Sequence, residues 1–170
     1  MNITLKNIKT FDTMDGMAWD ATVYIDGQKV GTAHNDGEGG GAFFHMSAEH
    51  EKRLEDHAKT LPWFRYDSDK DDFVDCEVDH SDGMAQNAEM LIETLIENAE
   101  QEKRMKRTLK SKAALIIEGK PGITTYSWKG CKQVTDRHLE AIRTKHPDAI
   151  MLNDLPHDEA LKVWVKHVFA

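Results

Sequence analysis

The chain has few of the residues and runs that define several large protein classes. Only two of its 170 residues are cysteine, Cys76 and Cys131, and they lack CxxC spacing, so a disulfide framework is excluded and a reducing compartment is expected. No window approaches the run of about 18 uncharged apolar residues that a membrane span needs. The opening MNITLKNIKTF has no apolar segment with a small-residue cleavage site, so no signal peptide is expected. We therefore expect a protein of the cytoplasm that has no membrane partner.

Signatures of the common catalytic and metal sites are also missing. The nine histidines form neither HxxxH nor HExxH, and there is no G-x-S-x-G. Asp67, Asp69 and Asp71 match the first ligands of a calcium loop, but Asp72 stands at its glycine position and Val78 at its final glutamate. The sequence therefore predicts no catalytic residue and no cofactor, and it assigns no metal.

Negative charge is in excess. The chain has 22 Lys and Arg against 30 Asp and Glu, a net charge of −8. This balance argues against sequence-independent binding to nucleic acid. It is compatible with a basic protein partner, and equally with plain solubility.

Glycine is concentrated in one place, after a predicted hairpin. Strands are expected over 2–11, 18–25, 29–34 and 42–46, with Asp26-Gly27 as the tight turn of the hairpin. The loop before the last strand has four glycines in five residues: Gly37, Gly39, Gly40 and Gly41. It lacks the Lys-Ser/Thr of a phosphate-binding loop, and no long helix follows directly.

Two interpretations of this glycine loop stay open. One is a strand connection that needs several residues at positive φ, and the other is a loop that presents backbone N–H groups to an anion. In the second interpretation His34 and His45 flank the loop and converge. The candidate ligand-binding residues are then His34, Asn35, Asp36, Gly39, Gly40 and His45.

The remaining pattern predicts an α+β protein. Helices are expected over 48–60 (with Ser47 as N-cap), 84–110, 136–145 and 157–168, a hairpin over 113–118 and 123–128, and a short strand over 149–152. The fold class is a small antiparallel sheet with an N-terminal β-hairpin, one long central helix and a C-terminal α/β portion. The parts are a strand-rich 1–61, an acidic loop 62–82 and a helical 83–170, or one domain overall.

The acidic segment 62–82 carries eight carboxylates with aromatic residues among them. It predicts a long, partly ordered loop with one short strand at 73–78. Aromatic anchors and carboxylates together favour a surface that a partner grips, and an irregular calcium site is the alternative. The candidate partner-binding residues are Trp63, Phe64, Tyr66, Asp69, Asp71 and Asp72.

Two stretches resemble known proteins. Residues 21–40, ATVYIDGQKVGTAHNDGEGG, are similar to the opening hairpin of an uncharacterised family of small tailed-phage or prophage accessory proteins. Residues 150–168, IMLNDLPHDEALKVWVKHV, resemble phage proteins in which Leu-Asn-Asp-Leu-Pro precedes a last helix. The two stretches cover about 40 of the 170 residues. The resemblance implies a protein of the infected bacterial cytoplasm that binds and inhibits a host factor, and it transfers no catalytic residue.

Two functions follow as expectations. The first is a non-enzymatic phage accessory protein that binds a host or defence-system protein, or sequesters a small ligand. The alternative is a metal-assisted hydrolase or nuclease that uses His34, His45 and nearby carboxylates at the glycine loop. The length of the helix predicted over 84–110 is also compatible with a homodimer.

Overall fold

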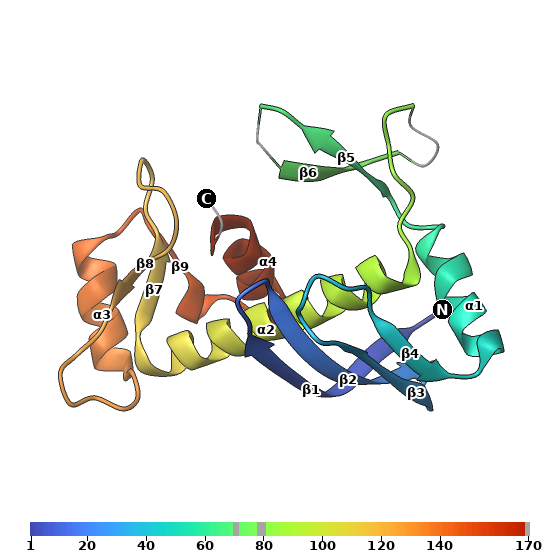
Figure 1. The fold of residues 1–170 in the computed structure, drawn as a ribbon. Helices are drawn as coiled ribbons and strands as arrows, with labels where there is room; N and C mark the ends of the chain where they lie inside the picture. Colours follow the sequence, from blue (N-terminus) through green and yellow to red (C-terminus); the bar gives the residue numbers. More distant parts are fainter. Residues whose placement is uncertain (70–71, 78–80, 169–170) are drawn as a thin grey trace. The chain divides into compact units, whose positions relative to one another are not determined.

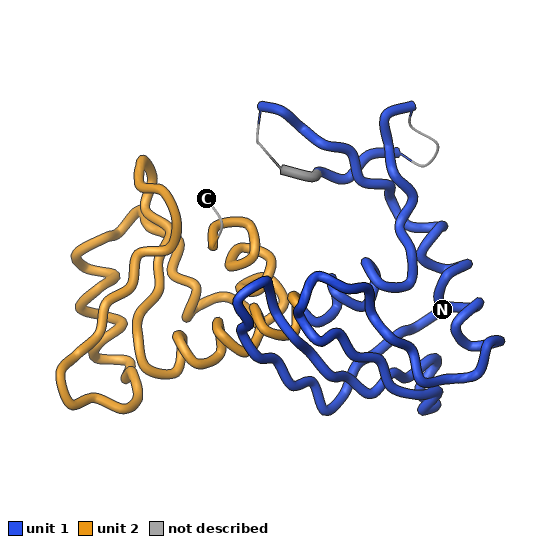
Figure 2. Tube along the Cα trace, viewed as in Figure 1, with its two compact units in different colours: residues 1–96 blue, residues 97–170 orange. Residues whose placement is uncertain are grey.

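The chain forms two compact units, unit 1 (Met1–Ile96) and unit 2 (Glu97–Ala170), which Figure 2 draws in different colours. The computed structural model describes residues 1–69, 72–77 and 81–168, without the side chains of Asp72 and Phe73. Antiparallel sheets and helices occur in both units, which confirms the predicted α+β class. Among the helices built from described residues, none has the length and apolar character of a membrane span.

Unit 1 is built on a four-stranded antiparallel sheet in the order β1-β2-β3-β4 (Figure 1). Its strands are β1 (Ile3–Asp12), β2 (Met17–Ile25), β3 (Gln28–Asn35) and β4 (Phe43–Met46). Asp26 and Gly27 join β2 to β3 at φ of 51° and 82°. Two consecutive residues at positive φ are typical of the tight turns that match the twist of a hairpin. The predicted N-terminal hairpin is therefore confirmed.

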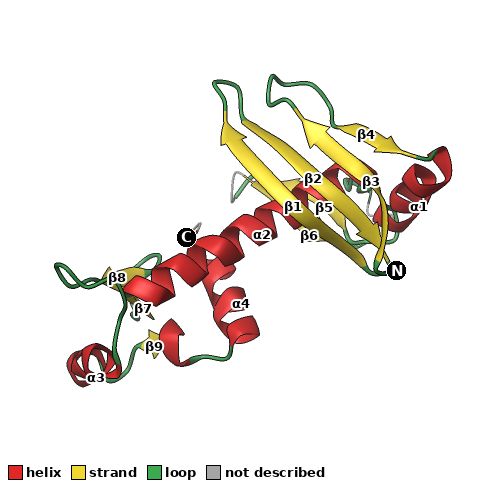
Figure 3. Cartoon of the chain, turned by 90° about the horizontal axis from the view of Figure 1, so that it is seen from below, coloured by secondary structure: helices red, strands yellow, loops and turns green. Residues whose placement is uncertain are grey.

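One face of this sheet carries the core of unit 1. Alternate residues of β2 are buried on it: Trp19, Ala21, Val23 and Ile25. α1 (Ala48–Ala58) contributes Leu54 to the same core, and α2 (Ala88–Ser111) contributes Ile92 and Ile96. Figure 3 looks onto the opposite face, with α2 behind the strands. We call the face turned away from these helices the outer face.

The structure corrects the expectation for the acidic segment. β5 (Trp63–Asp67) and β6 (Asp72–Cys76) form an antiparallel hairpin where the sequence predicted a loop with one strand. Phe64 and Met84 also exchange backbone hydrogen bonds of 3.0 and 2.7 Å. The aromatic residues favour extended backbone, and the carboxylates between them obscured that signal. The end of the strand expected over 73–78 lies outside the described residues.

The long helix begins later than expected, at Ala88 instead of residue 84. Met84 is held in extended backbone by Phe64, and the buried Gln86 donates from Nε2 to the carbonyl of Pro62 at 2.6 Å. Asn87 then caps the helix, because its Oδ1 accepts from the backbone N–H of Met90 at 2.8 Å. These tertiary contacts override a helical periodicity that continues through 84–87.

Unit 2 places helices on both faces of a three-stranded sheet, in the order β8-β7-β9. Its elements beyond α2 are β7 (Ala113–Ile116), β8 (Thr124–Tyr126), α3 (Asp136–Lys145), β9 (Ile150–Met151), η1 (Leu152–Asp154) and α4 (His157–Val168). On one face Leu115 packs with Leu139 and Ile142 of α3. On the other face Ala114 packs with Met105 of α2 and Trp164 of α4.

Asn153 ties the sheet of unit 2 to the end of α2. Its Oδ1 accepts from the backbone N–H of Ala114 at 2.9 Å, and its Nδ2 donates to the carbonyls of Leu109 and Lys112, each at 3.1 Å. The Leu-Asn-Asp-Leu-Pro motif thus has a structural explanation, since the last carbonyls of a helix need partners.

Candidate functional site

The outer face of the unit 1 sheet brings His34 and His45 together. The ring centroids of the two histidines are 5.1 Å apart. The ring centroid of Phe43 is also 5.1 Å from that of His34. In the sheet register His34 is opposite Phe43 and His45 is opposite Thr32. The three rings, which we call the ring stack, therefore meet across β3 and β4 and not across the glycine loop.

Cross-strand pairs extend this outer face over β1 and β2. Asp20 lies opposite both His34 on β3 and Lys9 on β1, and Phe11 lies opposite Ala18. Phe11 and Phe43 keep 60% and 54% of their surface exposed, which is unusual for phenylalanine. The sequence reasoning missed these two residues, although their alternation with buried positions could have revealed them.

The glycine loop has its own internal structure. Asn35 Oδ1 accepts from the N–H of Gly37 at 2.8 Å, and Asn35 Nδ2 donates to the carbonyl of Gly40 at 3.3 Å. Asp36 Oδ1 accepts from the N–H of Glu38 at 3.0 Å. The side chains of these two candidate ligands are therefore used to shape the loop, as is typical of Asx turns.

Gly37 explains why the loop needs glycine. It is buried at a φ of 72°, and a Cβ there would lie 2.6 Å from the backbone nitrogen of Ala18. Thr13 Oγ1 also donates to the Gly37 carbonyl at 2.7 Å. Gly39 has a φ of 79° and open space around it. These observations favour the strand connection over a cradle for an anion.

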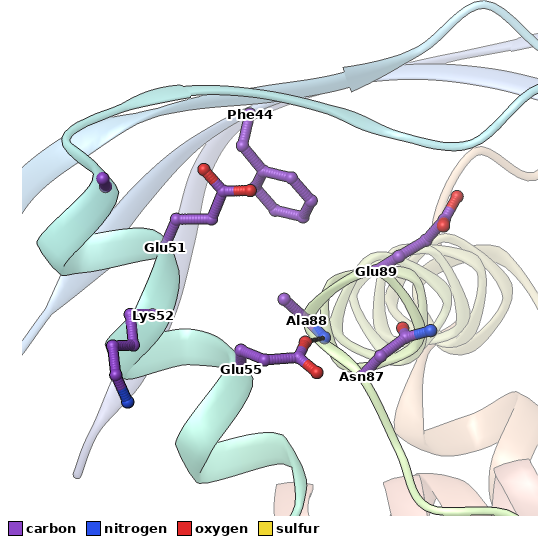
Figure 4. Close-up of a pocket in the computed structure, with 8 residues that line it drawn as sticks. Phe44, Glu51, Lys52, Glu55, Asn87, Ala88 and Glu89 are labelled. Carbon is purple, nitrogen blue, oxygen red and sulfur yellow. Dashed lines mark hydrogen bonds between the residues drawn. The ribbon is translucent and has the colours of Figure 1, made fainter.

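The structure also reveals a pocket that the sequence did not indicate. It has a volume of about 520 Å³ and lies between α1, the start of α2 and Phe44 of β4 (Figure 4). Its lining includes three carboxylates, Glu51, Glu55 and Glu89. These residues are far apart in the sequence, so no local pattern could have predicted the group.

Two of the pocket's carboxylates hold backbone groups. Glu55 accepts from the first N–H of α2, that of Ala88, at 2.8 Å (Figure 4), and it pairs with Lys59 at 3.0 Å. These contacts hold the pKa of Glu55 below its usual value. Glu89 accepts from the N–H of Ala42 at 2.6 Å, which fixes the end of the glycine loop to α2. Both carboxylates therefore act in the architecture of unit 1.

Glu93, one turn after Glu89 on α2, has a raised pKa. Burial is the main cause, and the charge of Glu89 adds to it. The indole N–H of Trp19 donates to Glu93 and opposes this rise. A carboxyl group with a raised pKa is typical of catalytic acids, but it also occurs where two carboxylates share a helix face. Glu89 lies one turn away on the same helix and contributes to the shift, and the described residues form no metal-ligand group, so we assign Glu93 to the second case.

The acidic hairpin offers one exposed aromatic side chain from the predicted set. Tyr66 keeps 52% of its surface exposed, whereas Trp63 and Phe64 are half-buried. The indole N–H of Trp63 is buried and has no hydrogen-bond partner in the part of the chain that the structure describes. Asp69 is exposed, Asp71 lies outside the described residues, and the side chain of Asp72 is not described.

Unit 2 contains a cysteine and a histidine side by side. Cys131 Sγ lies 3.9 Å from Nδ1 of His138, whose ring stacks on Trp128 with centroids 4.3 Å apart. The thiol donates to the carbonyl of Gln133, and His138 Nδ1 accepts from the N–H of Thr135 at 3.3 Å. Because both groups are engaged elsewhere, this pair lacks the orientation of a nucleophile with its base.

Within residues 1–69, 72–77 and 81–168 no three His, Cys, Asp or Glu side chains are grouped so that they could hold a metal ion. The ring stack therefore has two imidazoles without the third ligand that a metal site needs.

Comparisons with known proteins give no relative. No protein-family model matches the chain, and searches of the curated proteins and of the solved structures give no match. The function is therefore argued from the surfaces and contacts of the two units.

Proposed function

We propose that the protein is a phage or prophage accessory protein of the bacterial cytoplasm that binds a host or defence-system protein and inhibits it without catalysing a reaction. The outer face of unit 1 is the docking surface. The observation that carries this proposal is the pair of exposed phenylalanines, Phe11 and Phe43, on a sheet face that no described helix of unit 1 covers.

The distribution of exposed apolar side chains supports a protein partner. Seven of the eight large apolar side chains that are exposed among the described residues belong to unit 1: Met1, Phe11, Met14, Met17, Phe43, Tyr66 and Met84. Aromatic residues and methionine are enriched in protein–protein interfaces, where buried aromatic anchors supply most of the affinity.

The charge of unit 1 supports a basic partner. Unit 1 has 8 Lys and Arg against 20 Asp and Glu, a net charge of −12. Opposite charge on a partner steers association and disfavours acidic competitors. A basic face on a host protein, such as one that binds nucleic acid, would complement unit 1.

The other expected functions have less support. The pocket beside Phe44 could admit a small ligand, but Glu55 and Glu89 are bound to backbone N–H groups of the protein. The metal-assisted hydrolase would need a third ligand beside His34 and His45, and the described residues provide none. We therefore keep protein binding as the single proposed function.

A quantitative capture experiment tests the docking surface. The full-length protein and two variants, Phe11→Ser/Phe43→Ser and Ile150→Ser, are immobilised and exposed to bacterial lysate, and retained proteins are measured by mass spectrometry. We expect the wild-type protein and the Ile150→Ser variant to retain the same basic protein. The double variant should lose at least about 90% of it, because aromatic anchors commonly contribute 2 kcal/mol or more.

Ile150→Ser is the matched control because it also removes an exposed apolar side chain, from unit 2. Equal losses in both variants, or full retention by the double variant, would contradict docking on the outer face. Cross-links from the partner to β1 or β4 provide an independent readout of the same surface.

A further inference from the structure

Unit 2 has the opposite charge from unit 1, and its cations are concentrated in two segments. Unit 2 contains 14 Lys and Arg against 10 Asp and Glu, a net charge of +4. Residues 103–112 and 128–139 together hold nine of these cations and one carboxylate, Asp136. The net charge of the whole chain, −8, therefore does not describe this region.

The fold brings the two segments together at the end of α2. The N–H of Val134 donates to the carbonyl of Lys110 at 2.9 Å, and Ala113 pairs with Tyr126 in the sheet. The turn after Trp128 is closed by a 3.0 Å hydrogen bond from the N–H of Cys131 to the Trp128 carbonyl. Lys129 lies within this turn and Lys132 follows it directly, and Val134 bonds to Lys110 two residues further on, so both lysines lie in the same region as the end of α2.

Most of these cations have no acidic partner. Lys103 and Lys106 pair with Glu100 and Glu102 on their own helix. The other seven form no ion pair within the described residues, and all but Lys112 are exposed. We call these seven the basic surface: Arg104, Arg107, Lys110, Lys112, Lys129, Lys132 and Arg137.

Helix electrostatics explains only part of the basic surface. Cations near the C-terminus of α2 stabilise its macrodipole, which accounts for Lys110. Arg137 lies in the first turn of α3 (Asp136–Lys145), where the same macrodipole disfavours a cation. Lys129 and Lys132 belong to no helix. A common requirement for positive charge in this region, which α2, Lys112 after it, the segment after Trp128 and α3 all meet, explains the seven cations together.

We propose that the basic surface of unit 2 binds the phosphodiester backbone of nucleic acid. Phosphate contacts need cations at close spacing, and Arg104, Arg107 and Lys110 recur every three residues, about 4.5 Å apart along the helix axis. A protein partner would need apolar anchors, and Ile150 is the only large apolar side chain that is exposed among the described residues of unit 2. Trp128, half-buried against the core beside α3, and its stacked neighbour His138 lie next to Lys129, and aromatic rings beside cations are typical of single-strand sites.

The test is fluorescence anisotropy of a labelled oligothymidine with the full-length protein. With about five phosphate contacts, the affinity should fall about a hundredfold between about 50 and 200 mM NaCl. The Lys129→Glu/Lys132→Glu variant should bind at least tenfold more weakly, with a salt slope smaller by about 1.4. The control variant Lys9→Glu/Lys29→Glu makes the same change in net charge in unit 1 and should bind within about threefold of wild type.

Three outcomes would overturn the proposal. The first is no binding at the lower salt concentration, and the second is an equal loss of affinity in both double variants. The third is displacement of the oligonucleotide by polyglutamate at equal charge concentration, which would assign the surface to an acidic polypeptide. A duplex of the same length serves as a second probe: weaker binding than the single strand supports the role of Trp128, and tenfold tighter binding contradicts it. The Phe11→Ser/Phe43→Ser variant should bind the oligonucleotide normally, so this proposal can fail independently of docking on unit 1.

Discussion

The two units differ in what they leave on their surfaces. Unit 1 has a net charge of −12, and its described residues include seven exposed large apolar side chains, whereas unit 2 has a net charge of +4 and one such side chain among its described residues. Apolar anchors with negative charge suit a basic protein, and cations without anchors suit a polyanion. The net charge of the whole chain, −8, is the sum of these two opposite values, so it describes neither unit.

The largest expected effect on stability tests whether the two units unfold independently of each other. Ile92 and Met105 are both fully buried on α2, but they belong to the cores of unit 1 and unit 2. Replacing either residue with alanine leaves a cavity, so we expect each variant to lose about 2–5 kcal/mol of unfolding free energy. Urea denaturation gives this value, and hydrogen exchange locates the destabilised strands.

The strands in which hydrogen exchange becomes faster show which unit each residue stabilises. Ile92→Ala should raise exchange in β2 and β3, and Met105→Ala should raise it in β7. Equal increases in both sheets for either variant would show that the units unfold as one cooperative body, contrary to the division.

A smaller effect is expected in the glycine loop. Gly37→Ala forces a Cβ against the backbone of Ala18 at a φ of 72°, so it should cost about 1–3 kcal/mol. Gly40→Ala is the matched control because nothing lies within 4 Å of its Cβ position, and it should be neutral or stabilising by up to about 1 kcal/mol. Thermal unfolding measures both, and a cost at Gly40 equal to that at Gly37 would argue that the loop is not a passive connection.

The smallest effects have opposite pH dependence in the two units. Burial and Glu89 raise the pKa of Glu93 above 4.5, so its carboxylate form destabilises unit 1 at neutral pH, and this penalty disappears as the pH falls toward 4.5. Glu93→Gln should therefore raise Tm by about 1–2 °C near pH 7 and by less near pH 4.5.

The pKa of Asp154 in unit 2 is shifted in the opposite direction from that of Glu93. Hydrogen bonds of 2.6 and 2.9 Å from Arg143 lower its pKa below 3.8, so its contribution is present above 3.8 and is lost as the pH falls through the lowered value. Asp154→Asn should lower the free energy of unfolding by at most about 1 kcal/mol near pH 7, because the Arg143–Asp154 ion pair is solvent-exposed. If the stability of either variant differed from that of wild type by a constant amount over the whole pH range, the titration of the replaced carboxyl group would not be its cause.

Local patterns predicted the elements that depend on neighbouring residues. The Asp26-Gly27 turn, the Ser47 cap of α1 and the helix over 157–168 could be predicted because turn chemistry, capping and helical periodicity act over a few residues. The β5–β6 hairpin was missed because its carboxylates resemble a solvated loop. The start of α2 was misplaced because Phe64 holds Met84 from another part of the chain.

The candidate site could be predicted only in part. The sequence singled out His34 and His45. Their stacking with each other and with Phe43 depends on the register in which β3 pairs with β4. Asn35 and Asp36 had the right chemistry for a ligand, yet their side chains bind the loop itself. Distinguishing these outcomes requires the positions of partners that sequence spacing does not supply.

The sequence by itself determined the α+β class, the N-terminal hairpin, the helices outside the acidic segment and the total charge, because these follow from composition and short-range periodicity. Only the tertiary structure decided that the charge is divided between two units, that Phe11 and Phe43 share a face, and that the cations of 103–112 meet those of 128–139. The physical reason is that surfaces and capping contacts join residues 20 to 50 positions apart, and chain folding alone sets which of them become neighbours.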